Sequence, residues 1–105
     1  MYTFGAPRVG NSAFAAQWSS LFGQSTAFRV THGLDPVPHV PPRLTNFVHP
    51  PTEVYWDGLN TQFRVCDGSG EDPTCADQWL LPLGVTDHIT YLGFDFLDQF
   101  LKCAL

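Results

Sequence analysis

The stretch Arg29–Pro42 reads RVTHGLDPVPHVPP and leads from a strand-forming run into a rigid loop. Val30 and Thr31 are β-branched and favour a strand, which Gly33 would end. Asp35 follows at once, and each of the four prolines after it fixes φ at about −65°. α/β folds place their chemistry at strand ends, because a rigid sheet holds groups that a loop exposes. Asp35 is therefore a candidate functional carboxylate, although an aspartate before a proline is also a common turn former.

On the N-terminal side of this stretch, the sequence predicts one βαβ unit. Tyr2–Phe4 is a short apolar run that reads as a buried strand. Asn11 is a suitable N-cap, and apolar residues then recur at helical spacing until Gly23. This pattern predicts a helix over 12–22 with its apolar stripe on a sheet. Because Ala27–Thr31 is a second strand, the order of elements implies a parallel pair of strands.

On the C-terminal side, the sequence predicts an antiparallel hairpin and a terminal helix. Phe47–Trp56 and Gln62–Cys66 are extended runs, separated by the turn-forming residues Asp57–Asn60. The segment Asp67–Val85 is rich in glycine and proline and reads as a long loop, which favours a functional role. Residues 94–102 fit one apolar helical face. The predicted fold class is therefore α/β.

The composition describes one globular domain of 105 residues, with 44% hydrophobic and 14% charged residues. A net charge of −5 argues against nucleic acid as a partner and against electrostatic binding to anionic membranes. No apolar run approaches the length of a membrane span. The first ten residues, MYTFGAPRVG, have neither the charged region nor the apolar core of a signal peptide.

The three cysteines suggest an oxidising environment rather than a metal site. Cys66 and Cys75 flank a polar loop that a disulfide could close, for a stabilisation of about 2.5–3 kcal/mol. Cys103 is left over and implies a free thiol or a partner elsewhere. No zinc-type ligand spacing is present, so we expect no metal and no cofactor. The weakest alternative is a metal-binding module built from His32, His39, His49 and Asp35.

A candidate base follows the candidate acid. His88 comes after the long loop and before the terminal helix, where it could act as a general base or as an ordinary surface histidine. An acid followed by a histidine is the order found in α/β-hydrolase triads, whose nucleophile precedes both on a Gly-x-Ser-x-Gly elbow. No such elbow is present, because none of the serines has that context: Ser12, Ser19, Ser20, Ser25 and Ser69.

Four segments together resemble the C-terminal part of the fungal class 3 lipases, a group that includes feruloyl esterases. They are YTFGAPRVGN (Tyr2–Asn11), RVTHGLDPVPHVPP (Arg29–Pro42), VHPPTEVYW (Val48–Trp56) and DHITYLG (Asp87–Gly93). The resemblance covers nearly the whole chain. It implies that Asp35 is the triad acid and that His88 is the triad base.

The same resemblance implies that residues 1–105 are a partial α/β-hydrolase domain without the N-terminal half that holds the nucleophile elbow. It also implies a secreted protein that acts on an ester, either an acylglycerol or an aromatic ester, and that touches a lipid interface in the full enzyme. Family members often have a disulfide at the position of Cys66 and Cys75, and they often join a C-terminal cysteine such as Cys103 to one near the N-terminus. The chain alone is expected to be inactive, because its nucleophile is missing.

Apolar residues next to the two candidate catalytic loops are candidates for substrate contact, with core packing as the alternative role. They are Val37, Val40, Leu81, Leu83 and Val85. The choice between a lipase and a feruloyl esterase stays open, since the distinguishing lid would lie upstream. A non-catalytic binding protein or remnant that keeps the fold is the alternative to an enzyme fragment.

Overall fold

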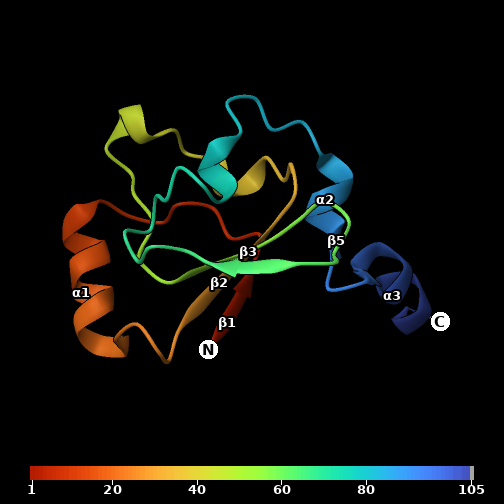
Figure 1. Ribbon diagram of the computed structural model, residues 1–105. Coiled ribbons are helices and arrows are strands. Elements are labelled where there is room, and N and C mark those ends of the chain that lie inside the picture. Colours follow the sequence, from red (N-terminus) through yellow and green to blue (C-terminus); the bar gives the residue numbers. More distant parts are fainter. Residues whose placement is uncertain (105) are drawn as a thin grey trace.

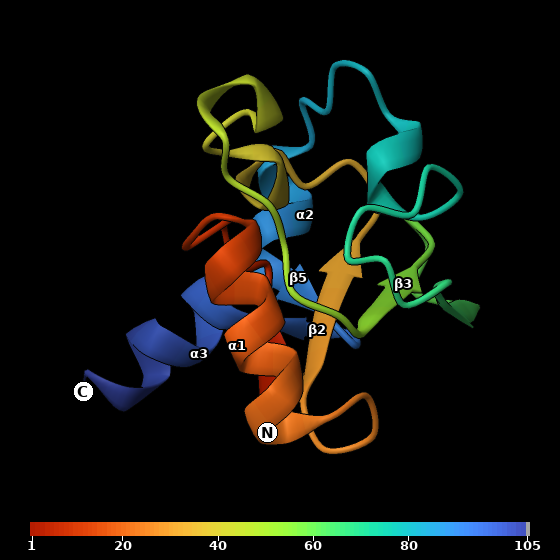
Figure 2. The same cartoon turned by 90° about the vertical axis from the view of Figure 1, so that its left-hand side faces the viewer.

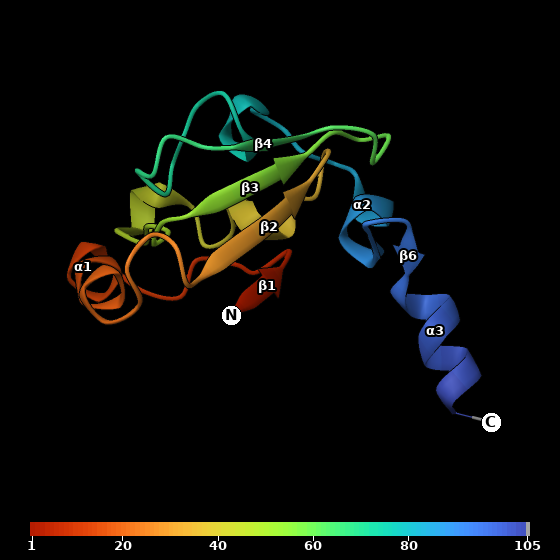
Figure 3. The ribbon, with the colours of Figure 1, turned by 60° about the horizontal axis from the view of Figure 1, so that its bottom comes forward.

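A four-stranded mixed sheet lies at the centre of the computed structural model, which describes residues 1–104 (Figure 1). Its strands, in order across the sheet, are β1 (Tyr2–Phe4), β2 (Phe28–His32), β3 (Glu53–Trp56) and β4 (Phe63–Val65). The first three are parallel and β4 is antiparallel to β3, so the predicted α/β class, parallel pair and hairpin are confirmed (Figure 3).

The crossover helix α1 (Ser12–Phe22) has the predicted bounds and caps. The Asn11 side chain accepts a hydrogen bond from the Phe14 N–H at 3.1 Å, and Gly23 ends the helix with a φ of 63°. Its apolar stripe was expected on the sheet, yet no residue of α1 is buried. Figure 3 shows why: α1 lies beyond the end of the sheet at which β2 and β3 begin. Seen from that side, the helix stands in front of the strands (Figure 2).

The segment before β3 differs from the expected strand. Extended pairing begins only at Glu53, because Pro50 and Pro51 have no N–H to donate to a sheet. Between β2 and β3 the chain forms two short 3-10 turns, Val37–His39 and Arg43–Thr45. The long loop after β4 contains one more, Ala76–Gln78.

The C-terminal third contains more elements than the sequence predicted. A five-residue helix, α2 (Val85–Ile89), precedes the small hairpin of β5 (Thr90–Tyr91) and β6 (Phe94–Asp95). The terminal helix α3 (Phe96–Cys103) starts after the predicted position of 94, because the Asp95 side chain caps it by accepting from the N–H groups of Leu97 and Asp98. It extends away from the sheet (Figure 1 and Figure 3).

The two faces of the sheet differ, because successive side chains of a strand point to opposite sides. Arg29 and Glu53 face the loops that cover one side, and both are buried. The other face is apolar and forms a groove of about 280 Å³. Tyr2–Phe4 was expected to be a buried strand; instead Tyr2 is 65% exposed at the edge of the sheet. In the described part of the chain, no helix is long and apolar enough to span a membrane.

Candidate catalytic site

Asp35 is held by its own loop just past the end of β2. The chain turns at Gly33, and the Asp35 N–H donates to the His32 carbonyl at 3.0 Å. Asp35 Oδ1 accepts from the Val37 N–H at 2.8 Å, which is the Asx-type turn expected of an aspartate before a proline. The residue is only 2% exposed. Asp35 is therefore both a turn former and a buried, oriented carboxylate.

His88 lies on α2, and its imidazole meets this carboxylate. His88 Nδ1 is 3.0 Å from Asp35 Oδ2, although the two residues are far apart in the sequence. The side chain of Asp35 is 1% exposed and that of His88 is 38% exposed. Because a carboxylate only accepts at neutral pH, Nδ1 carries the proton and Nε2 is the nitrogen left for other groups. The pair has the geometry of an oriented general base.

Tyr91 is a third member of the site that the sequence did not indicate. Its hydroxyl donates to Asp35 Oδ2 at 2.5 Å, and the residue is 2% exposed. Burial, together with the Asp35 carboxylate, raises the pKa of Tyr91, so the phenol stays protonated and remains a donor. The only sequence signal is its position three residues after His88, within an aromatic run that is also typical of packing.

We expect Tyr91→Phe to lower the free energy of unfolding by about 1.5–3 kcal/mol, the usual value of a hydrogen bond to a charged group. Urea denaturation of the chain measures this difference. The matched control is Tyr2→Phe, which removes the same hydroxyl from a side chain that is 65% exposed, and its effect should stay within about 0.5 kcal/mol. Equal effects of the two substitutions would contradict a role for the Tyr91 hydroxyl.

Gly5 brings the end of β1 against this site. Its φ is +58°, which favours glycine. A Cβ there would lie 2.7 Å from Asp35 Oδ2 and 2.8 Å from both His88 Nδ1 and the Tyr91 hydroxyl. Asp35, His88 and Tyr91 can therefore meet at this point because residue 5 has no side chain.

Gly5→Ala should separate Asp35 from His88 and lower ester hydrolysis by about 100-fold in a protein that also supplies the nucleophile, since small misplacements have effects of that size. Gly23→Ala is the control: φ is +63° there, so the backbone strain is similar, but a new Cβ would meet nothing within 4 Å. The measurement is kcat on a p-nitrophenyl ester. A loss of similar size in both variants would mean that strain alone, not contact with the pair, is responsible.

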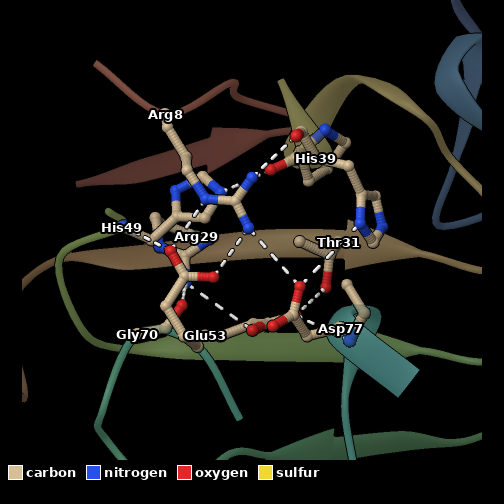
Figure 4. A pocket seen from close by; sticks show the side chains of 11 residues that line it. Arg8, Arg29, Thr31, His39, His49, Glu53, Gly70 and Asp77 are labelled. Carbon is tan, nitrogen blue, oxygen red and sulfur yellow. Dashed lines mark hydrogen bonds and ion pairs between the residues drawn. The ribbon is translucent and has the colours of Figure 1, made fainter. Parts of the chain in front are cut away.

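Four charged side chains form a buried charge cluster, which we define as Arg8, Arg29, Glu53 and Glu71. Figure 4 shows Arg8, Arg29 and Glu53 of this cluster. Arg8 donates to both carboxylate oxygens of Glu71, at 2.8 and 2.7 Å. It also donates to the carbonyls of His39 at 2.7 Å and Pro41 at 3.1 Å. The proline-rich loop that carries Asp35 is thus tied to the long loop that carries Glu71.

The second arginine of the cluster holds the strands to the same loop. Arg29 donates to the Pro50 carbonyl at 2.7 Å and to the Gly70 carbonyl at 2.9 Å, and it lies 3.6 Å from Glu53. Glu53 accepts from the Thr31 hydroxyl at 2.6 Å. Burial raises the pKa of Glu53. Burial acts in the same direction on Glu71, but the hydrogen bonds from Arg8 and the His49 N–H outweigh it and lower the pKa of that carboxyl.

Two of the three histidines of the metal-binding alternative, His32 and His49, contact backbone carbonyls of the protein. His32 Nδ1 lies 3.1 Å from the Asp87 carbonyl, and His49 Nε2 lies 2.7 Å from the Pro38 carbonyl. Burial, with Arg29 nearby, lowers the pKa of His49 to about 3, so this histidine is neutral. Within residues 1–104 the grouping close enough to share an ion is Glu53 with Cys66 and Cys75. Cys66 and Cys75 form a disulfide with a Cα–Cα distance of 6.3 Å, and this is the bond expected from the sequence.

Most of the apolar residues proposed for substrate contact are exposed. Val37 is partly buried, whereas the others are between 49% and 80% exposed: Val40, Leu81, Leu83 and Val85. Packing in the core is therefore not the role of these four exposed residues. In the described part of the chain no serine hydroxyl bonds to His88; for example, Ser19 donates to the Ala15 carbonyl and Ser69 accepts from the Glu71 N–H.

Comparison with known proteins gives consistent similarities. Residues 1–45 match the family model described as Lipase (class 3). The chain is 36% identical over 98 residues to a secreted mono- and diacylglycerol lipase of Fusarium solani, and 34% identical to a lipase of Rhizomucor miehei. These alignments cover 87% and 90% of the chain but only 28% and 26% of the two relatives. The chain thus spans about a quarter of the length of these relatives.

Solved structures agree with the sequence comparison. Lipase II from Rhizopus niveus superposes with a TM-score of 0.80 at 31% identity, over 90% of this chain and 35% of that one. A triacylglycerol lipase whose catalytic centre is formed by a serine-protease triad superposes with a TM-score of 0.79 at 34% identity, with the same coverage. The fold described above is thus one that fungal lipases share.

Proposed function

We propose that this chain, a relative of the class 3 lipases, carries the acid and the base of a serine ester hydrolase. The observation that carries the proposal is the hydrogen bond between His88 Nδ1 and the buried carboxylate of Asp35, at 3.0 Å. A histidine oriented in this way by an aspartate is the base of an acyl-transfer site. The similarity to fungal lipases supports the same assignment.

In the proposed reaction, a serine outside these residues attacks the ester carbonyl while His88 Nε2 removes its proton. The same nitrogen then gives the proton to the leaving alcohol, and an acyl-enzyme remains. Water, deprotonated by His88, hydrolyses that acyl-enzyme and restores the serine. Asp35 holds the imidazole in the tautomer with the proton on Nδ1 and stabilises its charged form, without becoming protonated itself.

The proposed substrate is an acylglycerol, with an aromatic ester as the alternative within the family. The exposed apolar residues that precede His88 in the chain suit an acyl chain and contact with a lipid interface, in particular Leu81, Leu83 and Val85. The Fusarium relative is a mono- and diacylglycerol lipase, and its secretion, with the disulfide found here, supports a secreted protein.

The domain proposed is the C-terminal portion of an α/β-hydrolase, with the nucleophile elbow in an N-terminal half. The exposed apolar groove on one face of the sheet supports this, since exposed apolar area of this kind favours a partner surface. A non-catalytic remnant of the same fold is the second candidate, and it is favoured by one observation: no serine of these 105 residues lies on a Gly-x-Ser-x-Gly elbow.

The test is to sequence the transcript upstream of the Met1 codon and to express the extended protein. We expect a Gly-x-Ser-x-Gly upstream of Tyr2, hydrolysis of a p-nitrophenyl ester, and labelling of that serine by a fluorophosphonate. The 105-residue chain alone should show neither turnover nor labelling. A transcript without that serine would favour the remnant, and turnover by the chain alone would refute the claim that its nucleophile lies elsewhere.

A further inference from the structure

The helix that carries His88 has little to hold it in place from within. α2 is five residues long, and none of its residues is buried. Its N-cap residue, Gly84, has no side chain that could cap the helix. A helix of this length is not stable by itself in water. Contacts with other segments must therefore fix the position of His88.

Those contacts come from the neighbour of His88. Asp87 Oδ2 accepts from the Leu34 N–H at 2.7 Å, and the Leu34 carbonyl accepts from the Gly84 N–H at 2.8 Å. The Asp87 carbonyl lies 3.1 Å from His32 Nδ1. Because Leu34 directly precedes Asp35, these bonds join the segment that carries the acid to the segment that carries the base.

The carboxylate of Asp87 occupies a slot between two glycines. Gly33 has a φ of +49°, and a Cβ at this position would collide with Asp87 Oδ2. A Cβ on Gly84 would lie 2.8 Å from the same oxygen. Side chains at either position would displace the carboxylate, so its place against the Leu34 N–H depends on both glycines.

We propose that Asp87 is a positioning residue: its carboxylate fixes α2 on the Gly33–Leu34 turn and so sets His88 Nδ1 at hydrogen-bond distance from Asp35. The inference rests on the proposed function, in which that hydrogen bond orients the base. Asp87 acts through the backbone of Leu34 and does not touch the reacting atoms.

The test uses proton NMR of the 105-residue chain, which needs no nucleophile. A histidine Nδ1 proton bonded to a carboxylate resonates far downfield, and we expect one such signal from His88. Asp87→Ala should abolish it. Asp87→Asn keeps an oxygen that accepts from the Leu34 N–H and should retain it. Gly84→Ala, which leaves the charge but fills the slot, should abolish it.

Asp98→Ala is the control, since it removes a carboxylate from exposed α3, where Asp98 pairs with Lys102. If the wild-type chain lacks the downfield signal, the Asp35–His88 pairing of the proposed function fails. If the signal is present and survives both Asp87→Ala and Gly84→Ala, or is lost in Asp87→Asn, the role of Asp87 is wrong. Should Asp87→Ala not fold, the contrast between Gly84→Ala and Asp87→Asn decides.

Discussion

Asp35→Asn should lower kcat for ester hydrolysis by about four orders of magnitude in the extended protein, with little change in KM. That is the typical size of the loss when the aspartate of a Ser-His-Asp triad becomes an asparagine. The amide oxygen of the substituted side chain can still accept from the Val37 N–H, as Asp35 Oδ1 does at 2.8 Å, so the loop keeps its shape. The amide nitrogen then faces His88 Nδ1 and donates to it. The imidazole is forced to carry its proton on Nε2, where it can no longer accept one from the nucleophile.

The design separates this effect from a general loss of charge or fold. Asp98→Asn makes the same chemical change on α3, where the side chain is 51% exposed, and should leave kcat unaltered. Urea denaturation of the Asp35→Asn variant should show an unfolding transition, which means that the variant is folded. Activity of the variant within about tenfold of the wild type would contradict the assignment of Asp35 as the triad acid, because the expected loss is far larger.

The elements that the sequence predicted well are those with local signals. Asn11 and Gly23 mark the ends of α1 through capping that involves neighbouring residues only, and β2 follows from its own β-branched run. The position of Asp35 past a strand end follows from the same local reading, because glycine and proline act within a few residues. His88 needed the resemblance to a family, since its surroundings alone favoured an ordinary surface or capping histidine.

What the sequence could not show depends on contacts between distant segments. α2 has no local cap and forms where Asp87 and Gly84 bond to Leu34, which lies far earlier in the chain. Tyr91 looks like a packing residue until Asp35 is placed beside its hydroxyl. The apolar run of β1 likewise indicates a surface to be covered, without showing which segment covers it.

The buried charge cluster is the clearest such case, and it leads to the largest expected effect on stability. Arg8 precedes α1 and Glu71 lies in the disulfide loop, yet their side chains are only 3% and 9% exposed and share two hydrogen bonds. Arg8→Met should lower the free energy of unfolding by about 3–5 kcal/mol, because it leaves the Glu71 carboxylate buried without its cation.

Urea denaturation of the chain measures that loss, and Lys102→Met provides the control. Lys102 pairs with Asp98 at 2.6 Å, but its side chain is 65% exposed, so about 0.3–0.5 kcal/mol is expected. Adding Glu71→Gln to Arg8→Met should restore part of the stability, since a neutral amide costs less to bury than an unpaired carboxylate. An Arg8→Met variant as stable as Lys102→Met would show that the cluster does not hold the two loops together.

The pH dependence gives a second test of the same pair, and its sign follows from the pKa of Glu71. Burial opposes the shift, but hydrogen bonds from Arg8 keep that pKa below the ordinary value of 4.5. The stabilisation is therefore fully present above pH 4.5 and is lost as the pH falls through the lower, folded-state pKa. The difference in unfolding free energy between wild type and Arg8→Met should shrink in acid.

His49 adds to this difference in the same direction, because Arg8 is one of the charges that lower the pKa of His49. With a folded pKa of about 3 against 6.5, the unfolded chain binds its proton first, and stability falls from pH 6.5 downward. Removing Arg8 takes away one cause of that low pKa, so the stability of Arg8→Met falls less below pH 6.5 than that of the wild type, and this too makes the difference shrink in acid. A difference that grew in acid would contradict the ion pair.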